Sequence, residues 1–393
     1  MRERQTIVIS GAGIGGLTAA LAIAPAGYHV VVCERADELS EIGAGIQLSP
    51  NAGRILAGLG LEEAIAAIAI EPKAIDIRSG RTGRGLTAIP VDAFRARYGY
   101  PYHVIHRADL QAALARAVQR HGDAELRFGA TVTDVLAKGD RLFVKIQRPG
   151  GSDVVTAAAL IGADGVWSAT RSRIPGAAAP RPSGRTAWRA VIPLDNAPAS
   201  FGTDRVTLWL GQEAHLVAYP IAGGAAINVV AIVEEDWDRP GWTAPGDRVA
   251  LLERFAAWAT EVRALLNAPF GWQKWSINAV DPAGPWCDGP IGLLGDAAHA
   301  MPPFLAQGAA MAIEDAAVLG QALAAAPEAA GALAVYEAAR KDRVSKVWKA
   351  AWRTGAHYHH GPRMAALRDF ALGLGGAPLL LRRNDWIYRW RPE

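Results

Sequence analysis

The sequence predicts an α/β protein in which an antiparallel β-sheet interrupts a doubly wound domain and a helical region follows. The chain opens with an apolar run at 6–10, a helix-forming segment at 14–26 and a β-branched run at 29–34, the pattern of a βαβ unit. Residues 181–279 read as alternating strands rich in Trp, Val and Thr. An apolar strand at 291–294, followed by an Ala-rich helix, then returns to α/β character.

The return of α/β character implies that distant sequence completes the first domain. A helix at 110–121 and strands near 125–135 and 141–147 are expected to extend it, and Ala222-Gly223-Gly224 is expected to form a turn in the sheet. The end of the chain is helical, basic and rich in Trp. The expected division is a first domain at 1–72, 101–180 and 281–334, a sheet domain at 73–100 and 181–280, and a C-terminal helical region at 335–393.

The composition is that of an enzyme-sized globular protein. The 393 residues carry 41 basic and 38 acidic side chains, so net charge does not favour nucleic acid as a partner. The sequence has two cysteines, Cys33 and Cys287, which excludes a disulfide framework and a cysteine-rich metal site and favours a reducing compartment. No secretory signal and no uninterrupted apolar run of about 20 residues is apparent. We therefore expect a soluble, cytoplasmic protein, monomeric or homodimeric, that binds no metal and no membrane.

A glycine-rich segment between the first strand and its helix predicts a dinucleotide site and a Rossmann-like domain. Gly11 permits a tight turn, Gly13 lets a pyrophosphate approach the backbone, and Gly16 lets the helix pack close to the sheet. Glu34 ends the second strand, at the distance where an acidic side chain meets ribose hydroxyls. This fingerprint is common to FAD and NAD sites. The candidate nucleotide-binding residues here are Gly11, Gly13, Gly15, Gly16, Glu34 and Arg35.

Two later segments indicate which nucleotide is bound. The segment 162–171, Gly-Ala-Asp-Gly-Val-Trp-Ser-Ala-Thr-Arg, resembles the Asp-Gly motif of FAD-dependent aromatic-ring hydroxylases, the group A flavoprotein monooxygenases. The segment 295–316 begins Gly-Asp-Ala-Ala-His and is similar to the second flavin motif of that family. Stretches 43–48 and 106–110 match further parts of it. The resemblance covers nearly the whole chain, and the nearest likenesses are salicylate, hydroxybenzoate and hydroxynicotinate hydroxylases.

The resemblance implies a p-hydroxybenzoate-hydroxylase-like fold with FAD as cofactor, NADH or NADPH as co-substrate, and O2. By the same resemblance, Asp296 is expected to hydrogen-bond the flavin ribityl chain, and Gly308 with Ala309 to offer backbone N–H groups to the flavin. The further cofactor-binding residues that it implies are Gly45, Arg107 and Asp164. No second G-x-G-x-x-G segment is present for the nicotinamide donor, as expected if the donor visits transiently.

The substrate is expected to lie against the inserted sheet. A strand's two-residue period places His215 and Tyr219 on one face, about 13 Å apart at about 3.3 Å per residue. The resemblance implies that His215 takes a phenolic proton and that Tyr219 helps to hold the substrate, and an imidazole suits that proton transfer near neutral pH. Pro303 stiffens the loop before the flavin-facing helix, and Arg189 is a candidate partner for a substrate carboxylate or the donor.

The resemblance implies hydroxylation of a small aromatic substrate, a hydroxylated aromatic acid, with NAD(P)H and O2 through a C4a-hydroperoxyflavin. A flavin epoxidase and a decarboxylating hydroxylase remain alternatives on the same scaffold. A non-catalytic FAD-binding protein and an ordinary NAD dehydrogenase are alternatives from other classes. His215, Tyr219 and Asp296 argue against a protein without catalysis, and flavin absorbance separates a flavoprotein from an NAD dehydrogenase.

Overall fold

The first lobe is built on a mostly parallel sheet with the strand order β18-β19-β11-β1-β2-β7. The structure, a computed structural model, describes residues 4–39, 45–139, 141–199, 201–237, 241–326 and 328–392. The strands of this sheet are β1 Thr6–Ser10, β2 His29–Cys33, β7 Ala124–Arg127, β11 Ala159–Gly162, β18 Cys287–Asp288 and β19 Ile291–Leu293. The edge strand β18 pairs antiparallel and the others pair parallel. The predicted βαβ opening and its completion by distant sequence are confirmed.

Helices cover this sheet, and α1 Ile14–Ile23 packs closely on α9 Gly308–Ala325. A β-carbon on Gly15 of α1 would lie 3.1 Å from Cβ of Ala312 in α9, and one on Gly320 of α9 would lie 2.6 Å from the carbonyl oxygen of Ala22 in α1. These glycines therefore permit the close approach of the two helices. The other helical elements of this lobe are η1 Ala24–Ala26, α2 Pro50–Gly58, α3 Glu62–Ala66, α5 Arg107–Arg120, η2 Arg171–Arg173, α8 Asp296–His299 and η5 Pro303–Leu305.

Two small sheets flank the first lobe. β8 Thr131–Lys138, β9 Arg141–Arg148 and β10 Gly151–Ala157 form an antiparallel sheet of their own. The single strand expected near 125–135 is wrong, because a turn with Gly129 at a φ of 58° separates β7 from β8. β3 Gly45–Leu48 pairs antiparallel with β6 His103–His106. Residues 43 and 44, part of the segment that resembles the hydroxylase family, lie outside the described residues.

The second lobe is a large sheet with the order β16-β17-β12-β15-β14-β13-β4-β5. Its pairs are antiparallel except for the parallel pair β13 and β4. The expected turn at 222–224 is confirmed as η4 Ala222–Gly224 between β14 and β15. The strands and helices of the second lobe are β4 Ala74–Ser79, β5 Gly85–Pro90, α4 Asp92–Tyr98, β12 Arg181–Pro193, η3 Leu194–Asn196, β13 Arg205–Gly211, β14 Ala214–Ile221, β15 Ala226–Glu234, β16 Thr243–Gly246, α6 Arg248–Arg254, α7 Thr260–Asn267 and β17 Trp272–Ala279.

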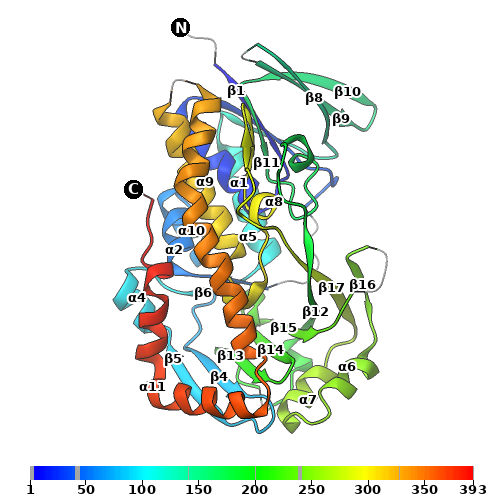
Figure 1. Cartoon of the computed structure of the whole chain (residues 1–393), viewed down its shortest axis with the longest axis vertical. Helices are drawn as coiled ribbons and strands as arrows, with labels where there is room; N and C mark the ends of the chain where they lie inside the picture. Colours follow the sequence, from blue (N-terminus) through cyan, green and yellow to red (C-terminus); the bar gives the residue numbers. More distant parts are fainter. Residues whose placement is uncertain are drawn as a thin grey trace.

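One face of the large sheet packs on α6 and α7, and the other faces the first lobe. Trp188, Leu216 and Val229 belong to the buried cluster that includes residues of α6 and α7. Ile232 and Phe304 belong to a separate cluster on the opposite face. Figure 1 shows the two lobes one above the other, with α10 running alongside both. This arrangement directs one sheet face toward the loops of the nucleotide-binding lobe.

The chain ends in two long helices, α10 Ala329–Tyr358 and α11 Pro362–Tyr388. The expected border at 335 falls inside α10, since this helix begins at Ala329. By length and composition alone α11 is apolar enough to cross a membrane, although it contains no uninterrupted apolar run of about 20 residues, and its most apolar window is 6% buried. The backbone leaves the helical conformation at Gly376, with a φ of 55° and a ψ of −163°, so α11 is bent into two arms (Figure 1).

Candidate active site

The glycine-rich segment forms a tight turn between β1 and α1. Gly11 has a φ of 104°, and a β-carbon on it would lie 2.4 Å from the carbonyl oxygen of Ala163. A β-carbon on Gly16 would lie 2.0 Å from the carbonyl oxygen of Gly11. Gly13 is the N-cap of α1 and has open space where a side chain would be. The turn therefore needs Gly11 and Gly16 for packing, while Gly13 leaves room for a diphosphate at the helix N-terminus, where the helix dipole favours an anion.

The carboxylate of Glu34 folds back onto this turn. Its Oε2 accepts a hydrogen bond from the N–H of Ala12 at 2.9 Å, and its Oε1 accepts one from the N–H of Ala36 at 3.0 Å. Nε2 of Gln111 in α5 donates to the carbonyl oxygen of Ala12 at 2.8 Å. Arg35 is exposed next to Glu34. Glu34 thus lies beside the glycine turn at the end of β2, where an acidic side chain meets ribose hydroxyls in nucleotide-binding folds.

Asp164 is held within its own turn. Its carboxylate accepts hydrogen bonds from the hydroxyl of Ser168 at 2.5 Å and from the N–H and hydroxyl of Thr170, both at 3.0 Å. Arg171 extends this turn toward α8 by donating to the carbonyl oxygen of Ala297 at 3.0 Å. The Asp-Gly motif therefore joins the end of β11 to the second flavin motif, and direct contact of Asp164 with the cofactor stays a prediction.

The second motif brings Asp296 and the start of α9 together. Asp296 is exposed at the first position of α8, and its Oδ1 lies 3.9 Å from where a β-carbon on Gly308 would be. Gly308 and Ala309 open α9. The N–H groups in the first turn of a helix have no acceptor within the helix. This corner therefore combines a carboxylate with backbone donors, the groups expected to contact the ribityl chain and the flavin ring.

The loop before α9 connects this corner to the sheet face. Pro303 is exposed, whereas the neighbouring Phe304 is buried and its ring centroid lies 5.5 Å from that of His215. Ala306 has a φ of 51°, a left-handed conformation that costs a non-glycine residue about 1–2 kcal/mol. Such strain persists where surrounding structure fixes the backbone, and it is frequent at functional loops.

Gly45 and Arg107 lie where the nucleotide-binding lobe meets the large sheet. Gly45 pairs with His106 between β3 and β6, which makes Arg107, at the start of α5, a near neighbour. A β-carbon on Gly45 would lie 2.5 Å from the Tyr219 ring, and the Gly45 N–H donates to Oδ1 of Asn228 at 2.9 Å. Gly45 therefore allows the Tyr219 ring to approach the backbone of β3.

The sheet register places three predicted substrate residues on one face. His215 and Tyr219 alternate with core-facing residues along β14, as the two-residue period predicts. Val217, between them on the same face, lies opposite Val230 of β15, which in turn lies opposite Arg189 of β12. Residues directly opposite each other across neighbouring strands project to the same side of a sheet. The structure therefore brings Arg189 to the face that carries His215 and Tyr219.

His215 is buried among aromatic side chains. Its ring centroid lies 5.3 Å from that of Tyr358, with Phe304 as a further neighbour, and its Nδ1 lies 2.8 Å from Nε2 of His359. Burial lowers the pKa of His215 well below its ordinary value, and the charges of His359 and Arg185 act in the same direction. A buried imidazole of this kind is neutral at pH 7 and is able to accept a proton.

Tyr219 occupies the opposite end of the same face. Burial raises its pKa, an effect that Arg189 and a hydrogen bond with Gln47 partly offset. Gln47 also accepts a hydrogen bond from the hydroxyl of Tyr102 at 2.5 Å. Tyr219 therefore remains a neutral phenol that is suited to hydrogen bonding rather than to acid–base exchange at neutral pH.

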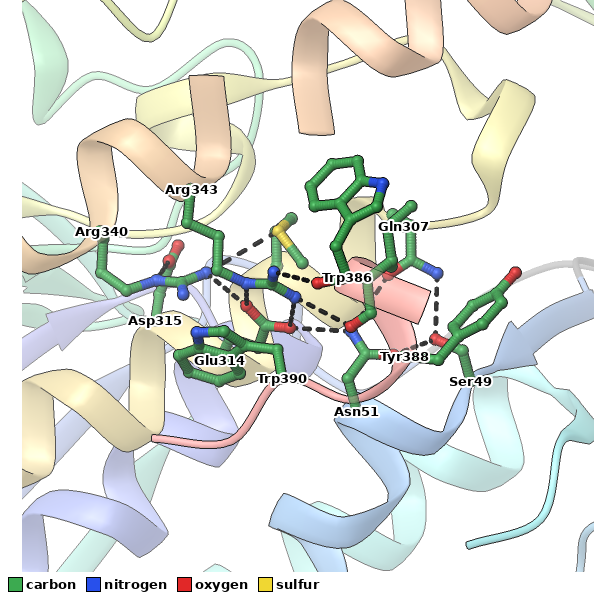
Figure 2. Close-up of polar contacts among 12 residues, drawn as sticks. Ser49, Asn51, Gln307, Glu314, Asp315, Arg340, Arg343, Trp386, Tyr388 and Trp390 are labelled. Carbon is green, nitrogen blue, oxygen red and sulfur yellow. Dashed lines mark hydrogen bonds and ion pairs between the residues drawn. The ribbon is translucent and has the colours of Figure 1, made fainter. Parts of the chain in front are cut away.

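A buried polar network lies behind the start of α9 (Figure 2). Nδ2 of Asn51 donates to Oε1 of Gln307 at 3.1 Å and to Oε1 of Glu314 at 2.8 Å, while Nε2 of Gln307 donates to the hydroxyl of Ser49 at 3.0 Å. Arg343 forms a two-point contact with Glu314 at 2.6 and 2.7 Å. The network thus fixes the residue directly before Gly308.

The network continues through a second carboxylate. Asp315 accepts from Nε of Arg340 at 2.7 Å and lies 2.6 Å from Nε2 of His299. Burial alone would raise the pKa of Asp315, but the charges of His299 and Arg340 outweigh it and lower the pKa. The guanidinium groups of Arg340 and Arg343 lie 4.8 and 4.7 Å from the Trp390 ring. The C-terminal segment is therefore held against the helix that begins at the flavin corner.

Replacing Arg340 with methionine is expected to lower the free energy of unfolding by about 3–5 kcal/mol, because it leaves buried carboxylates without their fully buried cation. The measurement is the urea midpoint followed by circular dichroism. Arg95→Ala is the matched control, since its pair with Glu71 is exposed and contributes about 1 kcal/mol or less. Equal midpoints for the two variants would contradict the role of the network.

Several residues of this site were not predicted from the sequence. Gln307 and Glu314 lie inside the second flavin motif, but the motif gives no partners for them. Asn51, Arg343 and His359 lie in segments without a motif, and their contacts join positions between 29 and 263 residues apart. The sequence offers one signal for such residues, a polar residue among apolar ones in a helical segment. This signal indicates a buried polar side chain but does not identify its hydrogen-bond partner.

The comparisons with known proteins agree with this geometry. A family model described as FAD binding domain matches residues 4–351. The chain is 36% identical over 387 residues to 3-hydroxybenzoate 6-hydroxylase 1 of Aquipseudomonas alcaligenes, covering 98% of this chain and 97% of that protein. It is 34% identical over 353 residues to 6-hydroxynicotinate 3-monooxygenase of Pseudomonas fluorescens, covering 88% and 90%.

A solved structure shows the same fold with the cofactor. An FAD complex of an Arg-to-Gln variant of HpxO from Klebsiella pneumoniae has a TM-score of 0.85 and 26% identity, covering 98% of this chain and 99% of that chain. The open glycine turn, Glu34 beside it, and Asp296 next to the start of α9 fit FAD. The expected family, fold and cofactor are thereby confirmed. The chain belongs to the FAD binding domain family and is an FAD-dependent monooxygenase related to the aromatic-ring hydroxylases.

Proposed function

We propose that the chain hydroxylates a small aromatic carboxylic acid that carries a phenolic hydroxyl, with NAD(P)H as electron donor and O2 as oxygen source. The observation that carries the proposal is the shared sheet face of His215, Tyr219 and Arg189. These side chains offer a base, a neutral hydroxyl and a cation, which match the polar groups of such a ligand. The relatives named for 3-hydroxybenzoate and 6-hydroxynicotinate support the same substrate class.

The residues of the first lobe are assigned to the cofactor. FAD, when bound, takes electrons from NAD(P)H and activates O2 for transfer of one oxygen atom. Gly13 admits the diphosphate to the N-terminus of α1, and Glu34 accepts hydrogen bonds from the ribose. Asp296 binds the ribityl chain, and Gly308 with Ala309 directs N–H groups to the flavin ring. The network behind Gln307 supports this assignment because it fixes the backbone at that point.

His215 is assigned as the general base. A phenolate places more electron density in the ring than a phenol does, so removal of the phenolic proton prepares the ring for an electrophilic oxygen. The lowered pKa of the buried His215 keeps the imidazole neutral and available at pH 7. Tyr219 holds the substrate from the opposite end of the face, and Pro303 borders it from the loop before α9.

Replacing Arg189 with methionine is expected to weaken binding of 3-hydroxybenzoate about 10- to 100-fold, because a charge-assisted hydrogen bond contributes about 1.5–3 kcal/mol. The measurement is the dissociation constant from the change in flavin absorbance on titration. The control ligand is 3-hydroxybenzamide, which lacks the negative charge and should bind both proteins alike. Equal weakening of both ligands would assign Arg189 a structural role instead.

The cellular setting is proposed from the same observations. A first arm of α11 from 362 to 375 is about 21 Å long at about 1.5 Å per residue, shorter than the roughly 30 Å apolar core of a bilayer. The second arm is tied to the protein by the pair of Arg97 with Asp385 at 2.6 Å. We therefore assign the enzyme to the cytoplasm, as a monomer or homodimer that does not span a membrane.

The direct test is substrate-stimulated oxidation of the nicotinamide. The purified FAD-loaded protein is mixed with NADH or NADPH and a panel of hydroxybenzoates, hydroxynicotinates and benzoates without a hydroxyl, and products are analysed by mass spectrometry. Acceleration by hydroxylated acids with a product that gains one oxygen supports the proposal. Acceleration without an oxygenated product, or none with any acid of the panel, would contradict it. Loss of carbon dioxide or formation of an epoxide would assign one of the alternative reactions.

A further inference from the structure

A chain of hydrogen-bonded side chains connects the buried His215 to the protein surface. His215 is 2% exposed, and its Nδ1 lies 2.8 Å from Nε2 of His359. Nδ1 of His359 lies 3.1 Å from Oε1 of Glu234. The side chain of His359 is 1% exposed, whereas that of Glu234 is 40% exposed. The three groups thus lead in two steps from the sheet face to solvent.

The fold positions each member of this chain. His215 lies opposite Ile232 on β15, and Glu234 follows two residues later on the same face. His359 is the C-cap of α10, and its backbone carbonyl accepts from the N–H of Glu213 at 3.4 Å. The end of α10 therefore meets the ends of β14 and β15, where His359 bridges the two strands.

The carboxylate determines which nitrogens carry protons. A carboxylate has no proton to donate and only accepts hydrogen bonds, so Nδ1 of His359 donates to Glu234. Nε2 of a neutral His359 is then an acceptor, which requires Nδ1 of His215 to donate. Nε2 of His215 is left as the basic nitrogen, and it has no hydrogen-bond partner within the described part of the chain. The surface carboxylate thus sets the tautomer that a base at His215 needs.

We propose that His359 and Glu234 form a proton route between His215 and solvent. The inference rests on the proposed function, because it takes His215 as the base. The phenolic O–H bond breaks and an N–H bond forms at Nε2 of His215. The proton on Nδ1 of His215 passes to Nε2 of His359, and the proton on Nδ1 of His359 passes to Glu234 and then to water. Return of one proton along the same route to the product restores both original tautomers.

The charges around the route favour transfer over storage of the proton. Burial lowers the pKa of His359, while Glu234 raises it, and Arg185 and Arg368 lower it further. The pKa of His215 is also lowered. Arg185 also donates to Oε1 of Glu234 at 2.9 Å, so this oxygen accepts from both Arg185 and His359. Neither imidazole is expected to retain a positive charge at pH 7, and a proton reaching them moves on to the exposed carboxylate.

The geometry is also sensitive to the neighbours that hold α10 in place. Arg368 of α11 donates to the carbonyl oxygen of Tyr358 at 2.8 Å and to that of His357 at 3.1 Å. Tyr358, next to His359, packs its ring against His215. The two residues before His359 are therefore fixed from α11, which keeps the imidazole within reach of both partners.

The experiment compares His359→Ala and Glu234→Gln with the wild-type holoenzyme, using the most active acid of the substrate panel. Gln can accept the hydrogen bond from His359 but cannot take up the proton. Both variants should lower kcat about 10-fold or more, a smaller loss than replacement of His215 itself causes. The dissociation constant of the substrate should change about twofold or less. Imidazole added to His359→Ala should restore turnover, since a free base can occupy the path. Glu253→Gln, on the exposed face of α6, is the control.

Two outcomes would overturn the proton route. In the first, His359→Ala and Glu234→Gln both keep the wild-type kcat and pH profile, although His215→Ala loses activity. The other is a loss of kcat that imidazole does not restore and that follows weaker substrate binding or loss of FAD, which is the pattern of a structural role.

A second readout does not depend on turnover. Nitrogen-15 NMR of histidine-labelled holoenzyme should show His215 protonated at Nδ1, with its signal assigned by the His215→Ala spectrum. A proton on Nε2 of His215 instead would overturn the route even in an active enzyme. If no acid of the panel stimulates the wild type, the proposed function fails, and the NMR result still decides whether the tautomer chain exists.

Discussion

Replacing His215 with alanine is expected to lower substrate-dependent turnover at pH 7 by about 100- to 1,000-fold, within the range that a positioned base contributes. Without the imidazole, the phenol ionises with its own pKa of about 10, so about one molecule in a thousand is a phenolate at pH 7. The measurement is steady-state NAD(P)H oxidation with quantified product, because oxidation without product does not report hydroxylation.

The pH dependence of His215→Ala separates loss of a base from loss of structure. Since the pKa of His215 is lowered well below its ordinary value, wild-type kcat/KM should be level from about pH 6.5 upward and fall only at lower pH. The variant should instead gain about tenfold per pH unit and approach the wild type near pH 9. His357→Ala, an exposed histidine at the same end of α10, is the control and should keep the wild-type profile. A profile of the same shape for wild type and His215→Ala would remove His215 from the mechanism.

Replacing Gly13 with aspartate is expected to abolish retention of FAD while leaving the apoprotein folded. A side chain at Gly13 meets no atom within 4 Å, and aspartate is a favoured N-cap, so the start of α1 should be as stable as before. The added carboxylate would stand where the diphosphate is expected. Repulsion between unit charges about 4 Å apart is about 4 kcal/mol near a protein surface, which weakens binding about a thousandfold.

The control for this variant carries the same substitution elsewhere. Gly122, in the exposed turn between α5 and β7, also has open space around it. Gly122→Asp should retain FAD as the wild type does. The measurements are the flavin-to-protein absorbance ratio after purification and the thermal midpoint of the apoprotein. A Gly13→Asp protein that purifies with a full complement of FAD would contradict the assigned diphosphate position.

The parts of the site that follow from local rules could be predicted from the sequence. The βαβ pattern and the spacing of Gly11, Gly13 and Gly16 depend on neighbouring residues, and the structure forms the turn that they require. The shared face of His215 and Tyr219 follows from the two-residue period of a strand, which the backbone imposes whatever surrounds it.

Contacts between distant segments could not be predicted in this way. His359 meets His215 across 144 residues because α10 ends beside β14, a position set by packing rather than by local pattern. Likewise, a single residue of α2, Asn51, reaches Glu314 across 263 residues. The break in α11 at Gly376 was also missed, because a glycine within an apolar helical segment does not by itself specify a bend.

The central claim is that FAD and the sheet face of His215 and Tyr219 together transfer one oxygen atom from O2 to a hydroxylated aromatic acid. The most direct test is turnover of the FAD-loaded enzyme with NADH or NADPH under oxygen-18 gas, using the hydroxylated acid of the panel that binds best. The account predicts a product with one oxygen-18 atom, formed once per nicotinamide oxidised in the well-coupled case. A product whose new oxygen comes from water, or nicotinamide oxidation that yields hydrogen peroxide and no oxygenated product with every acid, would contradict it.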